Sequence, residues 1–316
     1  MPAGSPHPLD RLRALAPRLV LGGALLILTV VLVERYIGWG RLLAPWRAQR
    51  PEALAAGTGL VLASYAARAV RVYDHFRPAT RSHFGACLRL TLLHNLLNNL
   101  LPMRLGEASF PALLGRYFAV PVVRGIAGLV WFRLIDLHVL AAAALIALGR
   151  DWLSGPALGT VLAAWLLVPW GVYLTRGPAE RLLARRPAGR VTHWLDEALA
   201  GMPPDAPTFW RSLLWTAVNW GLKLVVFAWL IHAFADATLG AAVIGALGGE
   251  LSSVLPVHGL AGAGTYEAGV VAGLTPFGVP AREAFAAAVN LHLFLLGTSV
   301  LGGLWALTLP RPHGPR

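Results

Sequence analysis

The chain has 316 residues, of which 56% are hydrophobic and only 13% are charged, and its mean hydropathy is +0.61. Soluble domains carry about 25% charged residues, so this composition excludes an ordinary soluble protein and indicates a polytopic membrane protein. The net charge of +12 does not indicate a nucleic-acid partner, because the arginines lie in short segments between apolar stretches, where they set topology. The single cysteine, Cys87, excludes an internal disulfide and a cysteine-based metal cluster, and the sequence has no cofactor motif.

Six apolar segments are long enough to cross a bilayer, which takes about 20 residues of helix. In chain order they cover roughly residues 18–37, 53–73, 125–148, 157–175, 211–233 and 284–308. Residues 1–17 and 310–316 are predicted to be tails, and 18–309 to form a single membrane domain. The longest polar loop covers 176–210, and a short surface helix is predicted within it from Val191 to Met202.

Two further apolar segments are each interrupted by a proline, then by glycine, and then by a glutamate. They are 87–118, with Pro102, Gly106 and Glu107, and 241–276, with Pro256, Gly264 and Glu267. Lipid offers no hydrogen bonds to the freed backbone, so such breaks are tolerated only where they are buried in protein or line a cavity. We therefore predict two re-entrant hairpins of broken helix. Simple kinks or loops are the alternative.

The distribution of arginines predicts the orientation of the chain. With a cytoplasmic N-terminus, and with each broken segment entering and leaving by one side, fourteen arginines lie on the cytoplasmic side and five on the other. Short loops rich in Arg and Lys stay on the cytoplasmic side, so both termini are predicted to be cytoplasmic. In this topology the half 157–308 repeats the half 18–148 upside down. Such an inverted repeat places a substrate site near the membrane midplane.

Seven ionisable residues fall inside apolar segments, namely Arg104, Glu107, Arg133, Asp136, Lys223, Glu250 and Glu267. A charge at the centre of a membrane helix costs about 2.5–3.5 kcal/mol on insertion scales, so these side chains must face the bundle interior or one another. Arg133 and Asp136 share a helix face at i,i+3 spacing and are predicted to pair. Arg104 and Glu107 have the same spacing. Glu250 is a candidate partner for Lys223.

Structural and functional roles compete at these positions. Charge neutralisation within the bundle would by itself explain the Arg133 pair, whereas Arg104, at a helix break, can hold a lipid phosphate. Glu267 either caps the helix that it opens or binds a cationic headgroup or a proton. The amides of Asn98 and Asn99 either satisfy freed backbone groups or contact a headgroup.

Three motifs lie along the chain: the run from Asn98 to Glu107, Arg133 followed by Asp136, and Pro256 followed by a glycine-rich stretch that ends at Glu267. Together they resemble the lysylphosphatidylglycerol synthase transmembrane region, a flippase-like membrane domain that also occurs in stand-alone proteins. The resemblance covers essentially the whole chain. The family usually has a glutamate where Phe132 stands, which puts a contact made by that glutamate in doubt.

The resemblance implies a cofactor-free transporter in the bacterial inner membrane, not an enzyme. Its substrate would be a phospholipid, an aminoacyl-phospholipid, a hopanoid or a polyprenyl-linked lipid. The predicted substrate contacts are Arg104, Glu107, Asn98, Asn99, Arg133, Asp136, Lys223, Glu250, Tyr266 and Glu267. Membrane lipids are the expected partners, with a homodimer through the face from Gly297 to Gly303 and lipid-synthesis enzymes as further candidates. The alternative is an integral-membrane enzyme, accessory subunit or scaffold in lipid or glycolipid synthesis.

Overall fold

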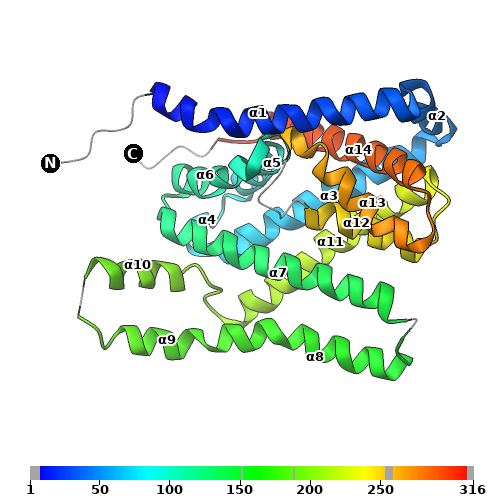
Figure 1. The fold of residues 1–316 in the computed structure, drawn as a ribbon. Helices are drawn as coiled ribbons and strands as arrows, with labels where there is room; N and C mark the ends of the chain where they lie inside the picture. The colour runs from blue at the N-terminus through cyan, green and yellow to red at the C-terminus, as the bar shows by residue number, and fades with distance from the viewer. Residues whose placement is uncertain (1–7, 151, 188, 253–258, 312–316) are drawn as a thin grey trace.

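The computed structural model describes residues 8–150, 152–187, 189–252 and 259–311, without the side chains of 8–19, 103 and 104. These residues form helices and no strands (Figure 1). The longer helices are α1 (Pro8–Leu32), α3 (Pro51–His75), α5 (Phe84–Leu100), α7 (Val122–Gly149), α8 (Gly155–Leu174), α11 (Ala206–Phe234), α12 (Leu239–Ser252) and α14 (Ala281–Thr308). The shorter ones are η1 (Val33–Ile37), α2 (Trp39–Ala48), α4 (Arg77–Thr80), η2 (Pro102–Ala108), α6 (Ser109–Phe118), α9 (Arg176–Leu183), α10 (Arg190–Leu199), η3 (Leu260–Gly262), α13 (Thr265–Leu274) and η4 (Thr275–Phe277).

Within the described part of the chain, six helical segments are long and apolar enough to cross a membrane, and they confirm the six predicted spans. They cover 20–37, 51–75, 122–149, 155–183, 206–234 and 281–308. Helix α1 begins at Pro8, inside the predicted tail 1–17. At the start of α11 the carboxylate of Asp205 accepts a hydrogen bond from the backbone N–H of Thr208 at 2.7 Å. Hydrogen bonding to the backbone and side chain of Thr208 holds the pKa of Asp205 below its usual value. A carboxylate that satisfies a free N–H in the first turn stabilises a helix start.

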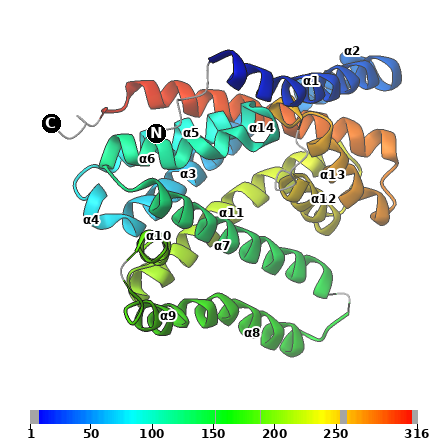
Figure 2. The same cartoon turned by 60° about the vertical axis from the view of Figure 1, so that its left-hand side comes forward.

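The interior of the bundle lies where α3, α5, α11, α12 and α14 meet. Helix α3 packs along α11, α14 packs along α5, and α12 packs between α11 and α13. Large side chains such as Tyr65, Phe227, Leu230 and Leu291 are fully buried there. Helix α1 lies across one side of this bundle, and α7 lies on the other with α8 and α9 beyond it (Figures 1 and 2). Helix α8 packs on α7 and is otherwise largely exposed, as expected for a helix in lipid.

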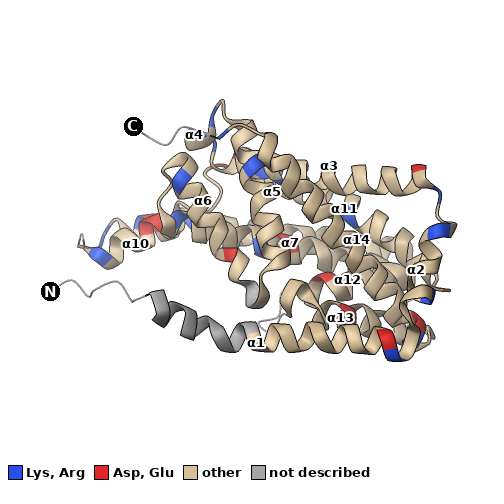
Figure 3. Cartoon of the chain, turned by 90° about the horizontal axis from the view of Figure 1, so that it is seen from above, with Lys and Arg blue, Asp and Glu red and all other residues tan. Residues whose placement is uncertain are grey.

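Charged positions along the ribbon lie mainly near the ends of the helices, and a few lie along α7, α11 and α12 (Figure 3). The predicted surface helix in the loop 176–210 is confirmed as α10. Its Glu197 forms a two-point ion pair with Arg124 of α7, with N–O distances of 3.0 and 3.3 Å. This ion pair connects α10 of the loop to the first turn of α7.

Two glycines of the predicted dimer face on α14 pack against a helix of the same chain, and the homodimer itself stays a prediction. A Cβ atom on Gly303 would lie 2.5 Å from the side chain of Leu96, and one on Gly302 would lie 3.2 Å from Leu92. Both glycines therefore serve close packing of α14 on α5 within one chain. Of the glycines in this stretch, only Gly297 faces open space.

Candidate functional site

The first predicted break lies between α5 and α6. Leu101 is extended, as the residue before a proline prefers, and Pro102 then opens the 3-10 helix η2. A Cβ atom on Gly106 would lie 2.3 Å from the Cα atom of Asn98, so only glycine lets η2 fold back onto α5. The Ser109 hydroxyl donates to the Gly106 carbonyl at 2.6 Å and lies 2.9 Å from the ring of His94, which holds the turn in place.

The second predicted break lies between α12 and α13, and its residues 253–258, with Pro256, lie outside the described residues. Beyond them Ala261 and Gly264 have positive φ angles of 52° and 83°. The Glu267 carboxylate accepts the Gly264 backbone N–H at 2.7 Å and thereby caps α13, which confirms the structural interpretation of this glutamate. Its other oxygen lies 2.7 Å from Nδ1 of His292 on α14. This contact ties the start of α13 to α14.

The two breaks lie against each other, because η2 contacts η3. Helix α1 packs over both. A Cβ atom on Gly22 of α1 would lie 3.0 Å from the Leu260 nitrogen and 3.0 Å from the Pro102 side chain. Segments that are about 150 residues apart in the sequence thus meet beneath α1. The described backbone of both breaks, at Pro102 and Leu260, thus lies against α1.

Asp136 of α7 is the centre of an ion-pair network. Its Oδ1 atom accepts hydrogen bonds from Nη1 of Arg71 at 2.7 Å and from the indole N–H of Trp220 at 3.1 Å. Its Oδ2 atom lies 3.5 Å from Nη1 of Arg133, which confirms the predicted i,i+3 pair. Arg133 also donates to Oε1 of Glu107 at 2.6 Å. The network therefore joins α3, α7, α11 and the first break, and Asp136 is only 3% exposed at its centre.

Phe132, where the resemblance led us to expect a glutamate, is buried beside this network. The guanidinium of Arg71 lies 4.4 Å from the centre of the Phe132 ring, in a cation–π contact. Arg71 also donates to the hydroxyl of Thr216 at 2.7 Å. An aromatic face thus covers the arginine on one side, and Asp136 neutralises its charge.

Lys223 and Glu250 form a second buried ion pair, between α11 and α12. The Nζ atom of Lys223 lies 3.1 Å from Oε1 of Glu250, which confirms the predicted partner. The ammonium also lies 4.6 Å from the ring of Trp220 and 5.1 Å from that of Phe227. Lys223 is 4% exposed, so its charge stays in the bundle interior and does not reach the membrane surface.

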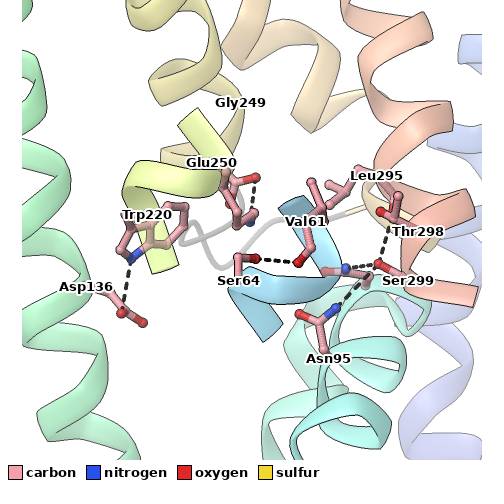
Figure 4. A network of polar contacts seen from close by, with 12 residues as sticks. Val61, Ser64, Asn95, Asp136, Trp220, Gly249, Glu250, Leu295, Thr298 and Ser299 are labelled. Atoms are coloured by element: carbon pink, nitrogen blue, oxygen red, sulfur yellow. Dashed lines mark hydrogen bonds and ion pairs between the residues drawn. The ribbon is translucent and has the colours of Figure 1, made fainter. Parts of the chain in front are cut away.

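A polar cavity of about 80 Å³ lies between the two ion-pair systems. Its lining consists of Arg68, Asn95, Asn98, Asn99, Arg133, Asp136, Leu137, Leu140, Trp220, Lys223 and Glu250. Figure 4 shows Asp136, Trp220, Glu250 and Asn95, which reach this space from α7, α11, α12 and α5. A volume of this size holds several water molecules or one phosphate-sized group.

The structure brings together most of the predicted site residues. Asn98, Asn99, Arg133, Asp136, Lys223 and Glu250 line the cavity, and Glu107 joins them through Arg133. The side chain of Arg104 lies outside the described residues, so its predicted phosphate contact stays a prediction.

Tyr266 and Glu267 lie apart from the cavity lining, packed against His292 of α14. Glu267 caps α13, the ring of Tyr266 lies 4.5 Å from that of His292, and the headgroup contacts of both residues stay predictions. We place them among the residues that shape the second break.

Sequence reasoning missed two arginines of α3. Arg71 is 3% exposed and Arg68 donates to Oδ1 of Asn95 at 3.2 Å on the cavity wall. The signal was present, because an i,i+3 pair of arginines inside an apolar span is as costly as the charges that were singled out.

The fold and the site together define a polytopic α-helical membrane protein with a charged cavity inside its bundle. Within the described ranges, no three His, Cys, Asp or Glu side chains are grouped to hold a metal ion. The family model of the lysylphosphatidylglycerol synthase transmembrane region matches residues 19–303, nearly the whole chain. The chain belongs to this family, which relates it to the modification or flipping of membrane lipids. No curated protein and no solved structure matches it.

Proposed function

We propose that this protein moves the polar headgroup of a lipid across the membrane through the cavity between α3, α5, α7, α11 and α12. The observation that carries the proposal is the charged lining of a space inside a bundle of six candidate membrane spans. Ionisable groups at membrane depth are expensive, and they typically mark the pathway of a polar substrate. The acyl or prenyl tails would remain in the lipid while the headgroup passes.

The two broken hairpins support this proposal. We propose that α5–α6 and α12–α13 re-enter the membrane from opposite sides and meet at their breaks, as two halves of an inverted repeat would. The contact between η2 and η3 agrees with this arrangement. Broken helices at a repeat interface commonly form the substrate site of secondary transporters. Among the described residues the cavity lies beside the first of these breaks, because Asn98 and Asn99 at the end of α5 line it.

The cellular setting follows the same proposal. We place the protein in the bacterial inner membrane with both termini in the cytoplasm, because the arginine-rich segments then lie on the cytoplasmic side. Membrane lipids are its proposed partners, and an enzyme that makes the transported lipid is a second one. We infer passive or ion-coupled transport, without a bound cofactor.

A liposome assay tests this function. Purified protein is reconstituted with headgroup-labelled lipids, and their movement between leaflets is followed for wild type and for Arg133→Gln. Arg133 bridges Glu107 and Asp136, so its neutralisation removes a cation that two carboxylates share and should slow translocation at least about tenfold. The matched control is Arg124→Gln on the same helix, whose ion pair with Glu197 lies at the edge of the bundle. It should leave translocation unchanged.

The alternative functions predict different results. An integral-membrane enzyme would convert a lipid into a product when the purified protein and its substrate are mixed, and that product would be visible by mass spectrometry. A scaffold would tolerate the loss of Arg133 without any change in lipid movement. Equal translocation by wild type and Arg133→Gln, with both proteins folded, would contradict our proposal.

A further inference from the structure

The cavity carries an unbalanced positive charge. Its lining has three cations, Arg68, Arg133 and Lys223, and two acids, Asp136 and Glu250. Each acid has a cation within ion-pair distance, because Asp136 contacts Arg71 and Arg133, and Glu250 contacts Lys223. Including the neighbouring Arg71 and Glu107 adds one positive and one negative charge, so the difference stays the same. One positive charge therefore remains within the described part of the site.

Arg68 holds this remaining charge. Among the described residues its hydrogen-bond partner is the neutral amide of Asn95, and no carboxylate lies within 4.0 Å of it. It also lines a second, smaller cavity of about 20 Å³ with Arg71, Arg133 and Asp136. Arg68 thus faces both spaces between the helices, where a cation without an acid beside it is costly.

Three N–H donors around these spaces also lack an acceptor. The Nε atoms of Arg68, Arg71 and Arg133 are buried and have no hydrogen-bond partner among the described groups. Buried donors are almost always satisfied, so an acceptor group that enters the cavity can satisfy these three. A phosphodiester fits, because it carries a single negative charge and offers only acceptor oxygens to arginine.

We propose that the cavity selects a headgroup with one phosphodiester charge and that Arg68 is the residue that binds it. This inference rests on the proposed function, whose site it uses, and it names the substrate class as a singly anionic phospholipid. A neutral lipid would leave the charge of Arg68 uncompensated. A cationic aminoacyl-phospholipid would bring a further positive charge beside Arg68 and Lys223.

Binding of short-chain lipids to the full chain in detergent tests the selectivity separately from transport. The ligands are dihexanoyl-phosphatidylglycerol, a neutral dihexanoyl-glycolipid, lysyl-phosphatidylglycerol of equal chain length, and tail-free glycerophosphoglycerol. Wild type should bind the phosphatidylglycerol about ten- to hundredfold more tightly than the neutral or cationic lipid. Arg68→Gln keeps an amide donor toward Asn95 and removes the charge, and it should abolish this preference. Arg124→Gln should keep it.

The outcomes separate the inference from the proposed function. Equal or tighter binding of the neutral or cationic lipid by wild type overturns the inference, even if lipids are translocated. A preference retained in Arg68→Gln overturns the role of Arg68. Selective binding without translocation in liposomes supports the inference and contradicts the proposed function. Binding of glycerophosphoglycerol as tight as that of the lipid would show a site for a free phosphodiester, and it would overturn the lipid as ligand.

Discussion

Asp136 shows how a single buried acid can organise several helices. It accepts hydrogen bonds from Arg71 and Trp220 and lies beside Arg133, so three elements converge on one carboxylate. A buried ion pair contributes little net stability relative to apolar packing, but breaking it leaves a costly unpaired charge. The network therefore fixes how α3, α7 and α11 are placed around the cavity, whatever it contributes to the free energy of unfolding.

The ion pair of Lys223 and Glu250 allows the cost of breaking a buried pair to be measured. Lys223→Met removes the cation beside Glu250, and Glu250→Gln removes the negative charge beside Lys223. Because each single change breaks a buried ion pair, each should lower the free energy of unfolding by about 3–5 kcal/mol. The double variant should recover more than half of the summed loss, because neither group then remains charged. Thermal unfolding of the four proteins in detergent gives the coupling energy. Additive losses would show that the pair is not coupled.

Within the second hairpin, α12 and α13 approach each other through glycines. A Cβ atom on Gly248 would lie 2.2 Å from the backbone oxygen of Gly269, and one on Gly269 would lie 2.3 Å from that of Gly248. Gly273 meets the Ile244 oxygen in the same way, at 2.6 Å. Small residues at helix contacts let backbones come close in a membrane, where burial of apolar surface drives no association. The glycines therefore let α12 and α13 pack closely, beside the contact of η3 with η2.

Gly248→Ala tests this packing. The added methyl group meets backbone and not a flexible side chain, so α12 and α13 must separate, and the free energy of unfolding should fall by about 1–3 kcal/mol. The matched control is Gly221→Ala in the middle of α11, where a Cβ atom meets nothing within 4 Å. That change should leave stability unchanged or slightly raised. A loss of equal size in both variants would show that helix flexibility, not close packing, explains the effect.

At the scale of the whole molecule, the orientation in the membrane is open to direct measurement. Cys87 is buried and can be replaced by alanine to give a cysteine-free background. Ser154→Cys, in the exposed turn before α8, and Ala184→Cys, at the exposed end of α9, then mark opposite sides. With cytoplasmic termini, a membrane-impermeant thiol reagent added to intact cells should label residue 154 and not residue 184. The reverse pattern would invert our topology.

Local patterns predicted a large part of this arrangement. Hydropathy identified six spans, and i,i+3 spacing identified the contact of Arg133 with Asp136, because both signals depend on neighbours in the chain. The partner of Lys223 was also found, since Glu250 was one of few acids in an apolar segment. The charge of Arg68 within an apolar span was visible in the sequence, but its contact with Asn95 depends on α5 lying beside α3, which no local pattern reports.

The sequence by itself determined the membrane class, the spans and the position of the first break, because apolar length and Pro102 act on the chain locally. Tertiary structure alone decided which buried groups meet. It joined Glu107 to Arg133 and Glu267 to His292, which are 26 and 25 residues apart, and among the described residues it gave Arg68 the neutral amide of Asn95 as its partner. The physical reason is that a buried charge must be neutralised by whatever packing brings near it, and helices distant in the sequence supply those neighbours.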